Sequence, residues 1–175
     1  MLKSLTRLFG AHEDRDGVRP LYAAVVAEAR QPHWYLEGGV ADTRDGRFEM
    51  VSAILALVLI RMEALGETAK GPSTALAEVF VEDMDGQLRE EGVGDVSVGK
   101  HIGKMMGALG GRLNAYRDAI EEEGDLERAL VRNLYRGDPP GKNAIGFIAA
   151  RLRALTGELD AMDGAAIVAG GWPGR

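Results

Sequence analysis

Apolar residues recur at helical spacing along most of the chain. Leu76, Phe80 and Met84 follow one another every four residues, and similar stripes occur before and after them. No segment alternates between apolar and polar positions over enough residues to predict a strand. The pattern therefore predicts an all-α protein, a single compact domain of about six helices, which lie at residues 20–30, 47–65, 75–91, 98–120, 126–135 and 144–160.

The helix expected at residues 47–65 is apolar around so much of its circumference that we interpret it as a long central buried helix. Asp45 and Gly46 form a turn signal just before it. Pro20 is well placed as the first residue of the preceding helix. Glycine and proline in residues 66–72 predict a loop after the central helix.

The helix expected at residues 98–120 carries an ordinary apolar face and, beside it, a row of small residues spaced by four. Each glycine inside a helix costs about 0.8–1 kcal/mol relative to alanine, so we expect a compensating contact. We favour an internal crossing, in which a neighbouring backbone packs against at least two of the four glycines. The alternative is a groove for a client helix, with Met105 and Met106 near the client surface. The row consists of Gly99, Gly103, Gly107, Gly111, Ala115 and Ala119.

Composition and charge are those of one globular domain. At 175 residues, 46% hydrophobic and 27% charged, the chain is long enough for one core and too short for two. We expect an amphipathic or flexible segment at residues 1–19, a helical domain at 20–160 and a loose tail at 161–175. The net charge of −6 gives no support for specific nucleic-acid binding. The lack of cysteine excludes disulfides and thiolate metal sites.

The start of the chain is a candidate amphipathic helix. Such a helix suits weak contact with a membrane surface, and a frayed terminus is the alternative. No secretory signal and no membrane-spanning stretch is visible. We expect a cytoplasmic protein, either free or peripheral on the inner face of the cytoplasmic membrane. The residues that suggest the helix are Leu2, Leu5, Leu8 and Phe9 on one side, with Lys3 and Arg7.

Acidic residues between positions 82 and 85 are the one candidate for metal chemistry. Glu82, Asp83 and Asp85 suit a magnesium site in a metal-dependent, all-α nucleotide hydrolase. The second acidic element of such a site is absent, and the segment also fails as a calcium loop. No Ser-His-Asp set and no phosphate-binding loop is present in the sequence. We therefore expect no enzymatic activity and no cofactor, and keep the hydrolase as an alternative.

A series of short motifs occurs in a specific order. The two longest are DTRDGRFE at residues 42–49 and LREEGVGD at residues 88–95. The shorter ones are Leu21-Tyr22, Ala29-Arg30, Tyr35, Asp83-Met84-Asp85, Val98-Gly99-Lys100, Tyr116 and Arg132-Asn133-Leu134-Tyr135. Over about residues 20–135, this order and wording resemble the ubiquinol–cytochrome c chaperone family, and the chain is similar to a leaderless, bacterial-type member.

The resemblance implies an all-helical, non-enzymatic assembly chaperone. Members bind newly made cytochrome b, a membrane protein, during biogenesis of the cytochrome bc1 complex of the respiratory chain. The resemblance also implies two further partners, a small protein and the ribosomal exit region. A structural adaptor without a client of its own is the remaining alternative.

The charged motif residues have two interpretations, an internal ion-pair network or a surface for a client or partner. We favour the network because unpaired buried charges are costly. We expect Arg47 in particular to be at least partly buried and paired with a motif carboxylate. The full set of candidate residues is Asp42, Arg44, Asp45, Arg47, Asp83, Asp85, Arg89, Glu90, Asp95, Lys100, Gly103, Met105, Met106, Gly107 and Tyr116.

Overall fold

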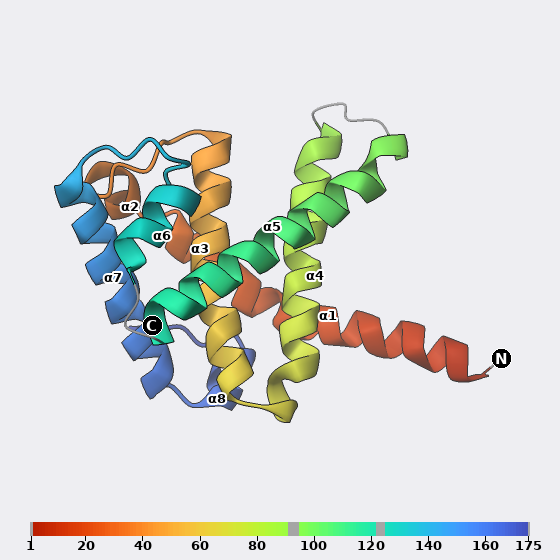
Figure 1. Cartoon of the computed structure of the whole chain (residues 1–175). Helices are drawn as coiled ribbons and strands as arrows, with labels where there is room; N and C mark the ends of the chain where they lie inside the picture. Colours follow the sequence, from red (N-terminus) through yellow and green to blue (C-terminus); the bar gives the residue numbers. More distant parts are fainter. Residues whose placement is uncertain (1, 91–94, 122–124, 175) are drawn as a thin grey trace.

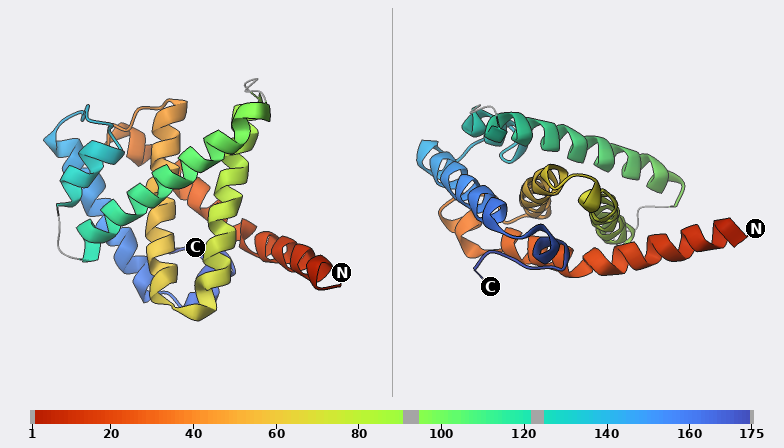
Figure 2. Two further views of the ribbon diagram at one scale, coloured as in Figure 1. Left: turned by 45° about the vertical axis from the view of Figure 1, so that its right-hand side comes forward. Right: turned by 90° about the horizontal axis from the view of Figure 1, so that it is seen from below.

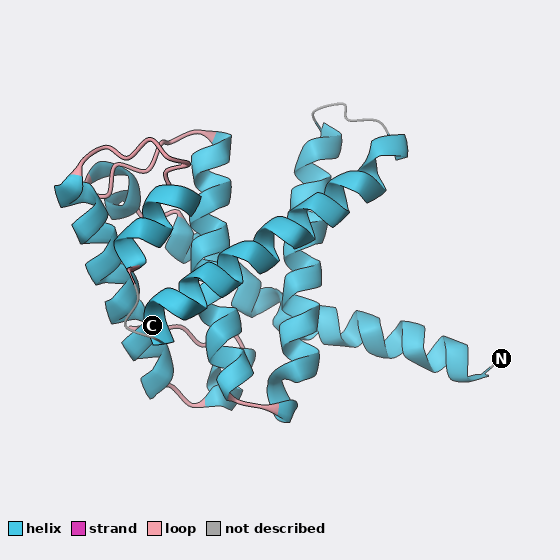
Figure 3. Cartoon of the chain, in the orientation of Figure 1, coloured by secondary structure: helices cyan, strands magenta, loops and turns pink. Residues whose placement is uncertain are grey.

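All regular elements in the described residues are helices (Figures 1 and 3). The structure is a computed structural model that describes residues 2–90, 95–121 and 125–174, with side chains over 15–87, 89–90, 103–120 and 125–174. The expected all-α fold is confirmed, with eight helices in the described residues where about six were expected. Their bounds are α1 Leu2–Ala29, α2 Pro32–Leu36, α3 Arg44–Ala64, α4 Glu67–Glu90, α5 Asp95–Glu121, α6 Leu126–Asn133, α7 Lys142–Ala161 and α8 Gly164–Val168.

The long helices form layers, which are clearest in the right-hand view of Figure 2, seen from below. α3 and α4 lie in the middle, α5 crosses one side of this pair, and α1 runs along the other side. α7 packs against α3 and α6, and α8 packs against α1 and α4. The first turns of α1 project beyond the other helices (Figure 1). The surfaces of α1 and α5 therefore face opposite sides of the molecule.

α3 is the centre of the core, as its sequence predicts. Every residue from Glu49 to Ile60 is buried. The helix begins at Arg44 and not at position 47, because the Thr43 side chain caps it by accepting a hydrogen bond from the Gly46 N–H at 3.2 Å. Gly46 thus lies in the first turn of the helix. A Cβ atom there would lie 1.9 Å from the carbonyl oxygen of Ala41, so only glycine fits.

Two prolines that we expected at helix boundaries lie inside helices. Pro20 is within the 28-residue α1, and Pro72 is within α4, which begins at Glu67. The connection between α3 and α4 is consequently very short and turns at Gly66, whose φ is 75°. Both prolines reach the solvent. Proline has no N–H group to donate to the carbonyl oxygen four residues before it, and water can form that hydrogen bond instead. Packing of the residues before and after each proline against the core then keeps the helix continuous.

The C-terminal segment, which we expected to be a loose tail, is packed against the rest of the protein. Its short helix α8 is capped by Asp163, whose carboxylate accepts a hydrogen bond from the Ala166 N–H at 3.1 Å. Ile167 and Trp172 are buried in the core. Two large apolar residues in a stretch of glycine and alanine produce no periodic pattern, so only the tertiary structure reveals their burial.

A buried ion pair fixes α5 on α3. The Arg112 Nε and Nη2 groups donate hydrogen bonds of 2.7 and 2.6 Å to the two carboxylate oxygens of Glu49. The same guanidinium lies over the Phe48 ring, 5.4 Å from its centre. Burial raises the pKa of the Glu49 carboxyl, and the Arg112 guanidinium opposes that rise. Because such a pair needs one geometry, it sets both the position and the rotation of α5.

Replacement of Arg112 by alanine tests this. Arg112→Ala leaves the Glu49 carboxylate buried without a partner, so the free energy of unfolding should fall by about 3–5 kcal/mol in urea denaturation. Arg47→Ala is the matched control, because Arg47 pairs with Asp42 at the surface. This variant should stay close to the parent protein. Equal losses in the two variants would contradict the importance of the buried pair.

Candidate functional site

The glycine row of α5 faces the solvent. A Cβ atom at Gly103, Gly107 or Gly111 would meet no other atom within 4 Å. The internal crossing that we favoured from the sequence is therefore wrong for these three glycines. Gly99, the fourth, lies outside the residues whose side chains are described. The alternative from the sequence, an open row available to a client, is the one consistent with this geometry.

The rotation of α5 explains why the row is open. Leu109 and Tyr116 are buried, and Arg112 reaches Glu49, so this face of the helix points to the core. A row spaced by four advances by about 40° per step around an α-helix. From Gly103, its first member with a described environment, the row therefore turns from the solvent side to the core, which it reaches at the buried Ala119.

Met106 adds an apolar side chain to the open glycines. It is 43% exposed, and in the described part of the chain Leu36 is the other large hydrophobic residue at the surface. Met105, in contrast, packs partly buried against the core. Tyr116 is fully buried and does not contribute to this surface. We name the set Gly103, Met106, Gly107, Gly110 and Gly111 the α5 outer face.

The charged motif residues form separate pairs at the surface. Arg47 pairs with Asp42 at 2.7 Å as expected, but its side chain is 56% exposed, so the expectation of burial is wrong. Arg47 lies on the solvent side of the first turns of α3. Further pairs join Asp45 with Arg136 at 2.6 Å, Asp85 with Arg89 at 2.8 Å, and Arg44 with Asp45 at 4.0 Å.

The remaining charged candidates are Glu90, Asp95 and Lys100. Glu90 is exposed at the end of α4, where it lines a pocket described below. Asp95 and Lys100 lie outside the residues whose side chains are described. The structure therefore brings the charged candidates onto several surfaces and does not join them into one internal network among the described residues.

Motif tyrosines hold helices together. Tyr22 on α1 donates a hydrogen bond of 2.6 Å to the Asp83 carboxylate on α4. Burial and this hydrogen bond raise the pKa of Tyr22. Tyr135 donates to the Gly38 carbonyl oxygen at 2.6 Å, and burial raises the pKa of Tyr135 to about 12. Burial likewise raises the pKa of Tyr116. These motif residues thus have structural roles.

The acidic residues of α4 are already engaged. Glu82 pairs with Arg15, while Asp83 accepts from Tyr22 and Asp85 pairs with Arg89. Within the described residues, no group of three or more acidic or histidine side chains is placed to hold a metal ion. The donor arrangement therefore lends no support to the hydrolase alternative.

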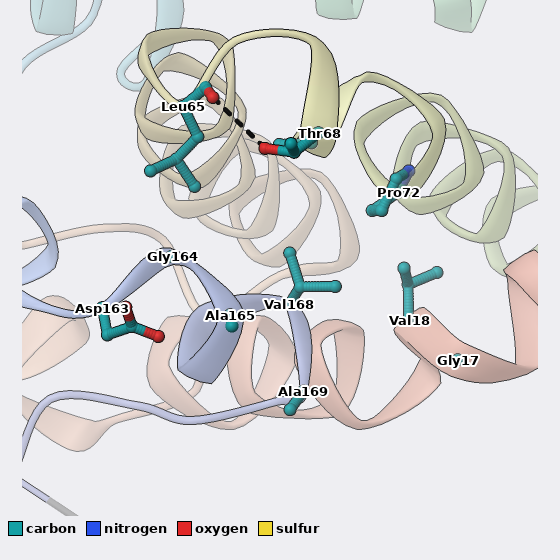
Figure 4. A pocket seen from close by; sticks show the side chains of 11 residues that line it. Gly17, Val18, Leu65, Thr68, Pro72, Asp163, Gly164, Ala165, Val168 and Ala169 are labelled. Atoms are coloured by element: carbon teal, nitrogen blue, oxygen red, sulfur yellow. Dashed lines mark hydrogen bonds between the residues drawn. The ribbon is translucent and has the colours of Figure 1, made fainter.

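Open pockets lie along α1. One of about 580 Å³ lies between α1, the start of α4 and α8 (Figure 4). Small and apolar side chains such as Val18, Pro72 and Val168 line it, and its one charged residue, Asp163, caps α8. Two others, of about 730 and 460 Å³, lie between α1 and α4 and around α2. Arg30 lines both of these.

Sequence reasoning missed the two residues on which the geometry of α5 depends. Glu49 belongs to the longest motif, yet it was not singled out, although an acidic residue next to a buried apolar run is a signal of a buried pair. Arg112 had no such signal, because arginine on a helix is usually a surface residue. Leu36, which is 78% exposed, was also missed.

Comparisons with known proteins identify relatives. The sequence profile described as Ubiquinol-cytochrome C chaperone matches residues 36–174. The crystal structure of the Cbp3 homolog from Brucella abortus matches with a TM-score of 0.80 and 31% sequence identity, over 98% of this chain and 95% of that one. No curated protein matches the chain. The profile match includes the packed C-terminal segment, which the motifs at residues 20–135 did not reach.

Gly103→Ala and Gly107→Ala test the open row. Each should raise the free energy of unfolding by about 0.4–1 kcal/mol, because alanine favours the helix and restricts the unfolded chain while its methyl group meets nothing. Gly46→Ala is the contrasting variant and should destabilise the protein, because its methyl group meets the Ala41 carbonyl. Thermal and urea unfolding measure both effects. A loss of stability in the α5 variants would show that the row is covered.

Proposed function

The chain belongs to the ubiquinol-cytochrome C chaperone family, and we propose that it binds newly made cytochrome b, or a similar membrane-protein client, during assembly of the cytochrome bc1 complex. In this proposal the protein catalyses no reaction. It covers an apolar helix of the client until that helix reaches its final partners. The α5 outer face is the surface that receives the helix.

The observation that supports this surface most strongly is that the glycines of α5 destabilise the helix without permitting any close contact within the described chain. Four glycines between Gly103 and Gly111 weaken α5 by roughly 0.8–1 kcal/mol each, and a Cβ atom at any of them would meet nothing. The fold of the isolated chain therefore gives no reason for glycine at these positions. A binding partner that approaches the bare backbone supplies such a reason.

The chemistry of the α5 outer face suits an apolar helix. Small residues let two helix backbones approach closely, as they do between membrane helices. Met106 lies between Gly103 and Gly107, and its flexible thioether adapts to differently shaped apolar surfaces. Lys104 and Asn114 are exposed nearby and provide a polar edge that keeps the free protein hydrated.

The two alternative functions, a hydrolase and a structural adaptor, account for fewer of these observations. A metal-dependent hydrolase needs acidic ligands that converge, whereas Glu82, Asp83 and Asp85 each have a separate partner. A structural adaptor without a client leaves the open glycine row unexplained. Membership of a chaperone family favours a non-enzymatic role as well. A small partner protein and the ribosomal exit region remain expectations of the family resemblance.

A bulky residue on the α5 outer face should block the client. Gly107→Leu and Met106→Glu should retain a folded protein, because both positions are exposed, yet reduce capture of cytochrome b at least tenfold. Capture is measured by co-purification with cytochrome b made by cell-free translation in the presence of the chaperone. Gly157→Leu is the matched control on α7, where the glycine is also exposed and open.

The controls distinguish an error in the proposed client surface from an error in the proposed client. Capture by the parent protein together with unchanged capture by both α5 variants would place the client elsewhere. Absence of capture by the parent protein would contradict the client itself.

Light contact with the membrane surface is a second part of the proposal. No helix in the described residues is long and apolar enough to cross a membrane. The start of α1 projects from the body (Figure 1) and contains four large apolar residues with Lys3 and Arg7. A helix of this kind can lie in the interface of an anionic bilayer.

Deletion of residues 1–10 tests this contact. The parent protein should bind vesicles that contain phosphatidylglycerol weakly, and added salt should weaken the binding further. The truncated protein should lose binding, which a vesicle co-sedimentation assay measures. Lys3→Gln combined with Arg7→Gln should give an intermediate result. Equal binding by the truncated and parent proteins would refute the contact.

A further inference from the structure

A second surface lies on the side of the molecule opposite α5 and is distinct from the proposed client surface. It includes two pockets that share Arg30 as a lining residue, one between α1 and α4 and one around α2. Its residues come from distant parts of the chain, including Tyr22, Tyr35, Arg47 and Asp83. We name the two pockets together the Arg30 groove.

Arg30 differs from the other arginines near the groove. Arg19 pairs with Asp16 and Arg47 pairs with Asp42. The Arg30 side chain is exposed and, within the described part of the chain, takes part in no ion pair. It therefore remains available to a ligand.

The residues around Arg30 are held in place by the fold. Tyr22 is hydrogen-bonded to Asp83, and the Tyr35 hydroxyl donates to the Ala29 carbonyl oxygen at 2.8 Å. Both tyrosines lie close enough for the Arg30 charge to lower their pKa values, against the larger effect of burial. Arg30 therefore lines each pocket together with a tyrosine that the fold holds in place.

An apolar residue completes the surface. Leu36 lines the pocket around α2 together with Pro32, and it is 78% exposed. Arginine is enriched among the residues that dominate protein interfaces, and the exposed leucine in the same pocket offers an apolar contact beside it.

The charge of the groove restricts what binds there. Asp42, Glu82, Asp83 and Glu90 also line it. The first three have partners, in Arg47, Arg15 and Tyr22 respectively. Acidic residues disfavour every anion, and they disfavour a phosphate group, with about −1.5 to −2 charges, or an anionic lipid surface more than a carboxylate with a single charge. One carboxylate, in contrast, needs only one guanidinium, which it binds through two parallel hydrogen bonds.

We infer that the Arg30 groove binds an extended peptide segment of a partner protein, in which one carboxylate pairs with Arg30 and a neighbouring apolar side chain packs on Leu36. The two pockets, of about 730 and 460 Å³, provide room for several residues on either side of the carboxylate. This surface does not depend on the proposed client surface of α5.

Selection from a library of random 12-residue peptides displayed on phage tests the inference with the full-length protein. Enriched peptides should share an acidic residue next to a large apolar one. A synthetic copy of the most enriched peptide should bind the parent protein and lose at least tenfold in affinity when its acidic residue becomes the amide. Arg30→Gln and Leu36→Ser should each produce a similar loss.

Arg153→Gln is the matched control, because Arg153 is an exposed arginine on α7 and its replacement causes the same change in charge. It should bind the peptide like the parent protein. Unfolding temperatures should agree among all variants, since the changed residues are exposed. Inorganic phosphate and phosphatidylglycerol vesicles serve as competing probes and should displace no peptide.

Three results would overturn the inference. The first is a selection that enriches no peptide or only peptides without acidic residues. The second is equal binding by the parent and Arg30→Gln proteins. The third is displacement of the peptide by phosphate or vesicles. The assay contains no cytochrome b, so its failure leaves the α5 proposal intact.

Discussion

The ion pair between Glu49 and Arg112 is the constraint on which the functional surfaces depend. The Glu49 side chain is buried and that of Arg112 is 15% exposed, and a carboxylate in that position is stable only with its guanidinium in place. The bidentate geometry permits one rotation of α5 about its axis. That rotation directs Leu109 and Tyr116 into the core and turns the glycine row to the solvent. A rotation in the other direction would bury the glycines and expose the apolar face.

Many motif residues that carry the family resemblance prove to be structural. Tyr22 joins α1 to α4 through Asp83, and Gly46 permits the close approach of the Ala41 carbonyl to the first turn of α3. Such residues keep a helical protein in one arrangement, because each satisfies a buried polar group or fills a space that no other residue fits. Other motif residues, such as Arg30, Asp42 and Arg47, line the Arg30 groove.

α5 and α1, which contribute to the two proposed surfaces, lie on opposite sides of the α3–α4 pair (Figure 2). The α5 outer face is apolar and has bare backbone, which suits a helix. The Arg30 groove is polar and has one unpaired cation beside Leu36, which suits an extended segment with a carboxylate. Because α3 and α4 separate them, a partner on one side leaves the other side accessible. Under the two proposals together, a client helix and a partner segment do not compete for one surface.

The sequence by itself determined the fold class, the buried central helix and the inner faces of the later helices. Ile145, Ile148 and Leu152 of α7 are buried as their spacing predicts, since helical periodicity records which face meets a core. Only the tertiary structure decided the rotation of α5, the continuation of α1 through Pro20 and the packing of Trp172. Each of these depends on a contact with a residue distant in sequence. A row of glycines is compatible with a buried crossing or an open surface, and the partner of Arg112, 63 residues away, decided between them.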